Sequence, residues 1–70
     1  MVRQPVTSSN LKSVGFDSFT QTLEIEFRNR SVYQYALVPA EIYAALMQAS
    51  SKGRFFDHRI RAYFRTIRVK

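Results

Sequence analysis

The basic residues near the end of the chain repeat at a helical spacing. Four residues fall at i, i+4, i+7 and i+11, which would place their side chains on one face of a helix: Arg54, His58, Arg61 and Arg65. Such a face spans about three turns, roughly 16 Å, and is long enough to contact several phosphates. Arginine dominates it, which favours planar, bidentate contacts to phosphate oxygens. The pattern predicts a nucleic-acid-binding helix face, which Lys52 and Arg68 extend.

The charge is distributed unevenly along the 70 residues. Residues 1–51 contain four basic and four acidic side chains, whereas residues 52–70 contain seven basic side chains and one acidic residue, Asp57. The net charge of +6 therefore belongs to the last nineteen residues. This asymmetry favours a polyanionic partner, with nucleic acid ahead of an acidic membrane or protein. A solvated basic tail that only aids solubility is the alternative.

Residues that could catalyse a reaction are sparse. His58 is the only histidine and the chain has no cysteine, so a metal site with two histidines or with thiolates is excluded within one chain. Glu24 and Glu26 share one face of a predicted strand beside Arg28, where carboxylates usually form cross-strand ion pairs. No nucleophile–base pair and no glycine-rich phosphate loop is present. We expect a non-catalytic protein without a metal or cofactor.

Three segments are predicted to be strands. Residues 22–28 alternate apolar and charged side chains, the period of a half-buried strand, and residues 12–17 and 31–38 provide two further strands. Residues 1–8 are expected to be a flexible N-terminal lead-in, and residues 9–70 a single domain. The predicted fold class is α+β, with a three-stranded antiparallel sheet followed by two helices packed on one face.

The loop between the second and third strands decides which way Tyr33 and Tyr35 point. With a two-residue turn at 29–30, both rings would lie beside glutamates. With a three-residue loop at 28–30, both rings would join the apolar face, because a one-residue slip turns every side chain over. The second register buries more apolar surface and requires Arg30 in the left-handed region. We favour it, and we expect the tyrosine rings to be mostly core.

The second half of the chain predicts two helices. Pro39 begins the first helix, in which apolar residues recur at helical spacing. Gly53 is available as a left-handed cap between the helices. The second helix is predicted over residues 53–64, with an aromatic stripe opposite the basic face. Residues 66–70 are rich in β-branched side chains and predict either a short strand or a frayed end.

The order and spacing of these segments resemble a known family. The succession SSNLKSVGFD, LEIEF, VYQY, IYAALMQASSKGRFF and IRAYF is similar to the KTSC domain over about residues 8–69. That domain occurs at the C-terminus of some lysyl-tRNA synthetases and as free-standing small bacterial proteins. Its central tyrosine pair matches Tyr33 and Tyr35, whereas Arg30 stands where glycine is usual and Phe16 where tyrosine is common. The resemblance implies RNA binding and supplies no catalytic residue.

These patterns lead to one expected function and one alternative. We expect a small binding module that holds RNA, structured or tRNA-like, through its C-terminal basic helix face. The alternative is a protein-interaction module that docks an acidic partner or forms a homodimer. The 70 residues contain no signal-peptide pattern and no stretch of transmembrane length, so we expect a cytoplasmic protein without a membrane partner.

Overall fold

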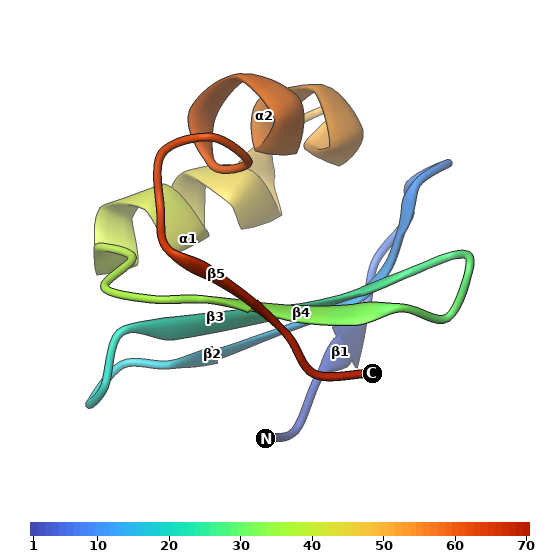
Figure 1. Ribbon diagram of the computed structural model, residues 1–70. Helices are drawn as coiled ribbons and strands as arrows, with labels where there is room; N and C mark the ends of the chain where they lie inside the picture. Colours follow the sequence, from blue (N-terminus) through green and yellow to red (C-terminus); the bar gives the residue numbers. More distant parts are fainter.

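Five antiparallel strands form one sheet, and both helices cover the same face of it (Figure 1). The computed structural model describes all 70 residues. The strands follow the chain order across the sheet: β1 (Gln4–Pro5), β2 (Leu11–Asp17), β3 (Thr22–Phe27), β4 (Val32–Tyr35) and β5 (Thr66–Arg68). The predicted α+β class with two helices on one face is confirmed, but the expected three-stranded sheet is wrong, because the sheet has five strands.

The two additional strands are the outermost ones. Gln4 pairs with Val14 of β2, so part of the expected flexible lead-in, residues 1–8, joins the sheet. At the other edge, Thr66 pairs with Tyr35 of β4, so the C-terminal segment folds back as a strand and does not fray. Strands of two and three residues are too short to show an alternating pattern. The sequence pattern therefore did not predict β1, and it left residues 66–70 undecided between a short strand and a frayed end.

The β3–β4 hairpin has the three-residue loop that the apolar pattern favoured. Tyr35 lies opposite Leu23, and the N–H of Phe27 donates to the carbonyl of Ser31 at 2.9 Å. Arg30 has a φ of 73°, in the left-handed region. Both tyrosines therefore share a face with the apolar residues of β3, and the favoured register is confirmed.

Replacing Arg30 with glycine is expected to stabilise the protein by roughly 1 kcal/mol, because glycine adopts a positive φ without the steric cost of a Cβ atom. The free energy of unfolding from urea titration measures this gain. Arg28→Gly is the control, since Arg28 lies in the same loop without a positive φ and should gain nothing. A loss of stability in Arg30→Gly would show that the side chain, and not the backbone strain, dominates at this position.

The two helices are α1 (Ala40–Gln48) and α2 (Lys52–Arg59), and a short extended connection joins them. Pro39 is the N-cap residue of α1, and the hydroxyl of Ser51 accepts the N–H of Arg54 at 3.4 Å to cap α2. Gly53 lies inside α2 and has no positive φ, so the expected left-handed cap is wrong. Neither helix has the length and hydropathy needed to cross a membrane.

α2 ends earlier than the predicted helix over residues 53–64. Its last residue is Arg59, and the chain leaves the helix at Ile60, which is fully buried. Burying Ile60 turns the following residues back toward the sheet, where they continue into β5. Tertiary packing therefore overrides a helical pattern that continues in the sequence.

Aromatic packing holds α2 against the sheet. Phe56 is only 4% exposed, and its ring meets the rings of Phe27 and Tyr35 edge to face, with centroid distances of 5.3 and 5.5 Å. Edge-to-face pairs add to the stabilisation that burial provides. This aromatic cluster fixes which side of α2 faces the sheet and which side faces solvent.

The opposite face of the sheet carries a polar network. Glu24 is 6% exposed, forms an ion pair with Arg3 and accepts a hydrogen bond of 2.8 Å from the amide of Gln34. Glu26 also lies within 3.7 Å of Arg3. Both carboxylates therefore pair with Arg3 of the N-terminal segment, which was not expected. The expected cross-strand pairing is present at Glu26, whose carboxylate lies 3.9 Å from the ammonium of Lys12 on β2.

The N-terminal segment reaches this network by passing close to Gly15. A Cβ atom on Gly15 would lie 2.7 Å from the carbonyl oxygen of Val2, which is too close for any side chain. Figure 1 shows the N-terminus on the side of the sheet away from the helices. The glycine therefore permits the close approach that brings Arg3 to Glu24.

The network predicts a loss of stability in acid. Burial raises the pKa of Glu24, but the hydrogen bonds from Gln34 and Arg3 and the positive charge of Arg3 outweigh it, so the pKa lies below 4.5. A carboxyl group with a lowered pKa contributes stability above the unfolded-state value, and loses it as the pH falls through the folded-state value. The melting temperature should therefore fall as the pH drops below about 4.5.

Melting curves from about pH 7 to about pH 3 test this expectation. Glu24→Gln should show a shallower dependence in acid, because it removes one group whose protonation is coupled to folding. Glu41→Gln, at the exposed start of α1, is the matched control and should follow the wild-type curve. An unchanged slope in Glu24→Gln would mean that other groups control acid unfolding.

Candidate nucleic-acid interface

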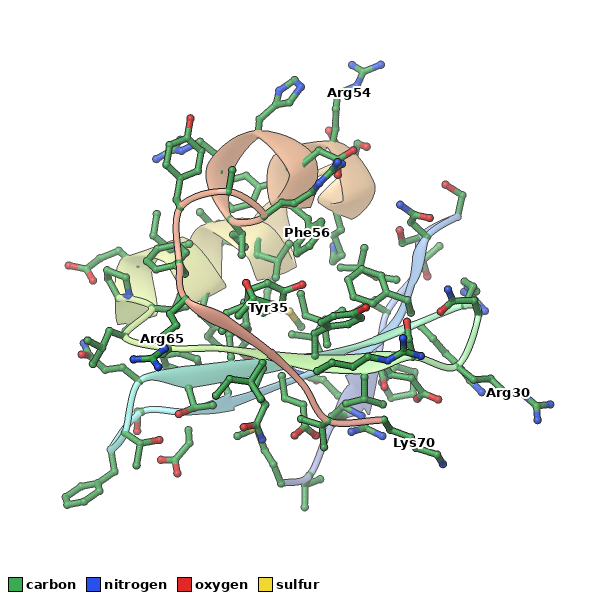
Figure 2. All side chains as sticks on the ribbon, in the orientation of Figure 1. Arg30, Tyr35, Arg54, Phe56, Arg65 and Lys70 are labelled. Atoms are coloured by element: carbon green, nitrogen blue, oxygen red, sulfur yellow. The ribbon has the colours of Figure 1, made fainter.

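The predicted contact residues do not lie on one helix. They divide between α2, the turn after it and β5 with its flanking residues: Lys52, Arg54, His58, Arg61, Arg65 and Arg68. Figure 2 shows Arg54 directed away from α2, and Arg65 on a separate part of the molecule beside the sheet. The expected single ridge over three helical turns is therefore wrong, because α2 ends at Arg59.

One group of basic residues remains on α2. The α2 basic cluster consists of three exposed residues: Arg54, His58 and Arg59. They border a shallow depression that Ser51 and Phe55 also line. The guanidinium of Arg59 lies 5.6 Å from the ring centroid of Phe55, a cation–π contact. Neither arginine of the cluster has a carboxylate within ion-pair distance, so both charges are available to an anion.

A second group surrounds β5. The C-terminal basic cluster also consists of three exposed residues: Arg65, Arg68 and Lys70. The guanidinium of Arg68 lies 5.8 Å from the ring centroid of Tyr33, and its Nε donates to the carbonyl of Lys70 at 3.2 Å. These contacts hold Arg68 on the helix side of the sheet edge.

Arg61 follows the α2 basic cluster in the chain and has an acidic partner. Its guanidinium lies 3.3 Å from the carboxylate of Asp57, one helical turn earlier. Exposed pairs of this kind contribute little to stability. Asp57 is the only acidic residue between 52 and 70, so the other basic residues of that segment are left without an acidic neighbour in sequence.

Two residues of α2 differ from the sequence-based expectation. The ammonium of Lys52 donates to the carbonyl of Ala49 at 3.1 Å, so this predicted contact residue also satisfies the C-terminal end of α1. Arg59 was missed, because it lies beside the predicted arc and not on it. The signal that could have found it is Phe55 four residues earlier, since residues i and i+4 are neighbours on a helix.

The tyrosine pair belongs mainly to the core. Tyr35 is 3% exposed and is part of the buried cluster, whereas Tyr33 is partly buried and packs against it. The ring of Tyr33 meets the ring of Phe27 edge to face at 5.9 Å. The expectation that the ring bodies are mostly core therefore agrees with the structure.

The fold and its residues match one described family. The family model of the KTSC domain matches residues 7–64. The chain belongs to the KTSC domain family. A crystal structure of a KTSC domain protein from Yersinia pestis has the same fold, with a TM-score of 0.96 and 43% sequence identity over 99% of this chain and 97% of that one. The resemblance seen in the sequence is confirmed.

Relatives carry the KTSC domain in chains of very different length. A protein of Stutzerimonas stutzeri is 44% identical over 57 residues, which are 81% of this chain and 80% of that protein. A lysine–tRNA ligase of Trichormus variabilis is 40% identical over 57 residues, again 81% of this chain but 10% of the ligase. The similarity to the ligase is therefore that of one shared domain.

Proposed function

We propose that this KTSC domain protein is a non-catalytic module that binds RNA through α2 and the segment that follows it. The observation that carries the proposal is the unpaired positive charge of residues 52–70. The single acidic residue there, Asp57, is paired with Arg61, and neither basic cluster has a carboxylate partner. Surfaces of this kind gain affinity for a polyanion by releasing its condensed counterions.

Two observations favour folded RNA as the partner. The two basic clusters lie on different elements, α2 and β5, so they suit phosphates that converge in space better than a straight row of phosphates. The shared domain in lysine–tRNA ligases supports tRNA-like RNA in particular. We also propose that the protein acts in the cytoplasm, without a metal or cofactor.

A salt titration tests this proposal. Binding to tRNA, duplex RNA, single-stranded RNA and DNA should be measured over a range of ionic strengths. We expect the tightest binding to tRNA, and a linear fall of log K with log salt whose slope is about 0.7–0.9 per phosphate contact. Binding that is absent at low salt, or that does not respond to salt, would contradict the proposal.

An exposed sheet edge favours a second candidate function, a protein-interaction module. β5 has no partner on its outer side; Ile67 within it is 55% exposed, and Val69 directly after it is 53% exposed. Such an edge can accept a strand from an acidic partner or from a second copy of the chain. Sedimentation over a range of concentrations would detect a homodimer. Ile67→Lys, which places a charge on the exposed edge, should then shift the equilibrium toward the monomer.

A further inference from the structure

A pocket of about 360 Å³ opens between the sheet and α2, beside the C-terminal basic cluster. Four rings line it: Phe27 of β3, Tyr33 and Tyr35 of β4, and Phe56 of α2. Figure 2 shows Tyr35 and Phe56 in the space between the sheet and the helix. The volume lies at the lower end of the range for small-molecule sites, roughly 300–1,000 Å³, which limits the occupant to a small planar group.

The hydroxyl of Tyr35 is the most informative atom of this pocket. Tyr35 is only 3% exposed, and its hydroxyl makes none of the side-chain hydrogen bonds within the chain. Every fully enclosed side-chain oxygen or nitrogen of the protein has a hydrogen-bond partner. The unpartnered hydroxyl of Tyr35 is therefore not enclosed, and it is accessible from the pocket that Tyr35 lines. Because it has no partner within the chain, solvent or a ligand in the pocket accepts its proton.

The protonation of Tyr35 makes its hydroxyl a donor at neutral pH. Burial and the nearby Tyr33 raise the pKa of Tyr35 to about 12, and the positive charge of Arg61 opposes them. Tyr33 and Arg61 line the same pocket as Tyr35. The free phenol is therefore an O–H group directed at an acceptor that the protein does not supply.

Two further side chains of the pocket, Asn29 and Arg61, also present donors, whereas the hydroxyls of Ser31 and Thr66 already donate within the chain. The side-chain oxygen of Asn29 already accepts the N–H and hydroxyl of Ser31, at 3.0 and 2.6 Å, which leaves its amide N–H groups free. Arg61 contributes a guanidinium, one nitrogen of which pairs with Asp57, and no carboxylate lines the pocket itself. Aromatic walls with converging donors fit a planar ligand that presents carbonyl oxygens and carries a negative charge nearby.

We propose that this pocket takes one unpaired, carbonyl-rich nucleobase of the RNA, uracil in preference to adenine, with the adjoining phosphate at Arg61. Uracil presents two carbonyl acceptors to these donors, whereas adenine has ring nitrogens but no carbonyl as acceptors, and its exocyclic amine would face a donor. Bases bind proteins through aromatic contacts when they are unpaired. The inference rests on the proposed RNA binding and deepens it, because it names a base-reading site beside the phosphate-binding surface.

Tyr35→Phe is the sharpest test, because it removes the hydroxyl and no intramolecular hydrogen bond. Binding should be measured by titrating short single-stranded oligouridylate and oligoadenylate. We expect about a five- to tenfold loss of affinity for oligouridylate, the equivalent of one hydrogen bond, and little change for oligoadenylate. Tyr43→Phe is the control, since the Tyr43 hydroxyl bonds Gln4 at 3.3 Å outside the pocket.

A second measurement separates this site from the proposed function. Amide chemical shifts on adding uridine monophosphate should change around the hairpin loop at 28–31 and β4. Arg61→Gln should weaken the binding of the monophosphate more than the binding of uridine.

The outcomes distinguish the two proposals. If Tyr35→Phe binds both oligonucleotides like the wild type while tRNA binding persists, the base site is overturned and the RNA-binding proposal stands. If no RNA binds the wild type, both are overturned. If free uridine monophosphate binds as tightly as oligouridylate, the ligand is a mononucleotide, which also overturns the RNA-borne base.

Discussion

Phe56→Ala is expected to remove a large part of the protein's free energy of unfolding. Phe56 is 4% exposed and its ring contacts both Phe27 and Tyr35, so its removal opens a cavity where α2 meets the sheet. Truncation of a buried phenylalanine costs about 3–5 kcal/mol. A domain of this length has a total stability of only about 3.5–10 kcal/mol, at roughly 0.05–0.15 kcal/mol per residue. The loss is therefore a large part of the whole.

Circular dichroism during urea and thermal unfolding measures this effect. Phe19→Ala makes the same chemical change at a side chain that is 94% exposed, and it should leave the unfolding curve unchanged. A loss below about 1 kcal/mol for Phe56→Ala would mean that α2 is anchored by other contacts.

Replacing Arg54, Arg59 and Arg65 together with glutamine is expected to weaken RNA binding broadly while the protein stays folded. All three are exposed and none has a carboxylate partner, so the core does not depend on them. If each contacts a phosphate, the slope of log K against log salt should flatten by about 2–3. The loss should be similar for different RNA sequences, because phosphate contacts carry no base information.

The matched control removes the same number of charges from the other half of the chain. Lys12, Arg28 and Arg30 can be changed together to glutamine, and this variant should keep nearly the wild-type slope. Arg61, which lines the pocket at Tyr35, is left unchanged in both variants. Equal losses in the two variants would indicate attraction by overall charge and not by the two basic clusters.

Local patterns were sufficient for the part of the fold that depends on neighbouring strands. The alternation over residues 22–28 and the apolar set around Tyr33 and Tyr35 led to the observed register, even though it places Arg30 at a positive φ. The energetic argument succeeded because burial of several side chains outweighs strain at one loop residue. Strand pairing of this kind is specified by residues close in sequence.

Long-range contacts were beyond the reach of the same patterns. The helical spacing of basic residues continues through Arg61 and Arg65, and only the burial of Ile60 shows why the helix stops. Residues 1–8 were expected to be flexible, but they pair with β2 and place Arg3 beside Glu24. Both contacts join segments that are distant in the sequence. The pocket at Tyr35 was also missed, because its walls come from β3, β4, α2 and β5.

The order of strands in the sheet has a consequence for the folding kinetics. From β1 to β4, every strand pairs with its neighbour in the chain, so these contacts close short loops and form early. The β4–β5 pairing instead joins Tyr35 to Thr66, two residues separated in sequence by both helices. The three residues of β5 are all exposed. β5 is therefore expected to dock last and to detach first by local unfolding. Since Thr66 lines the pocket at Tyr35, transient detachment of this strand would give a base a way in without unfolding the core.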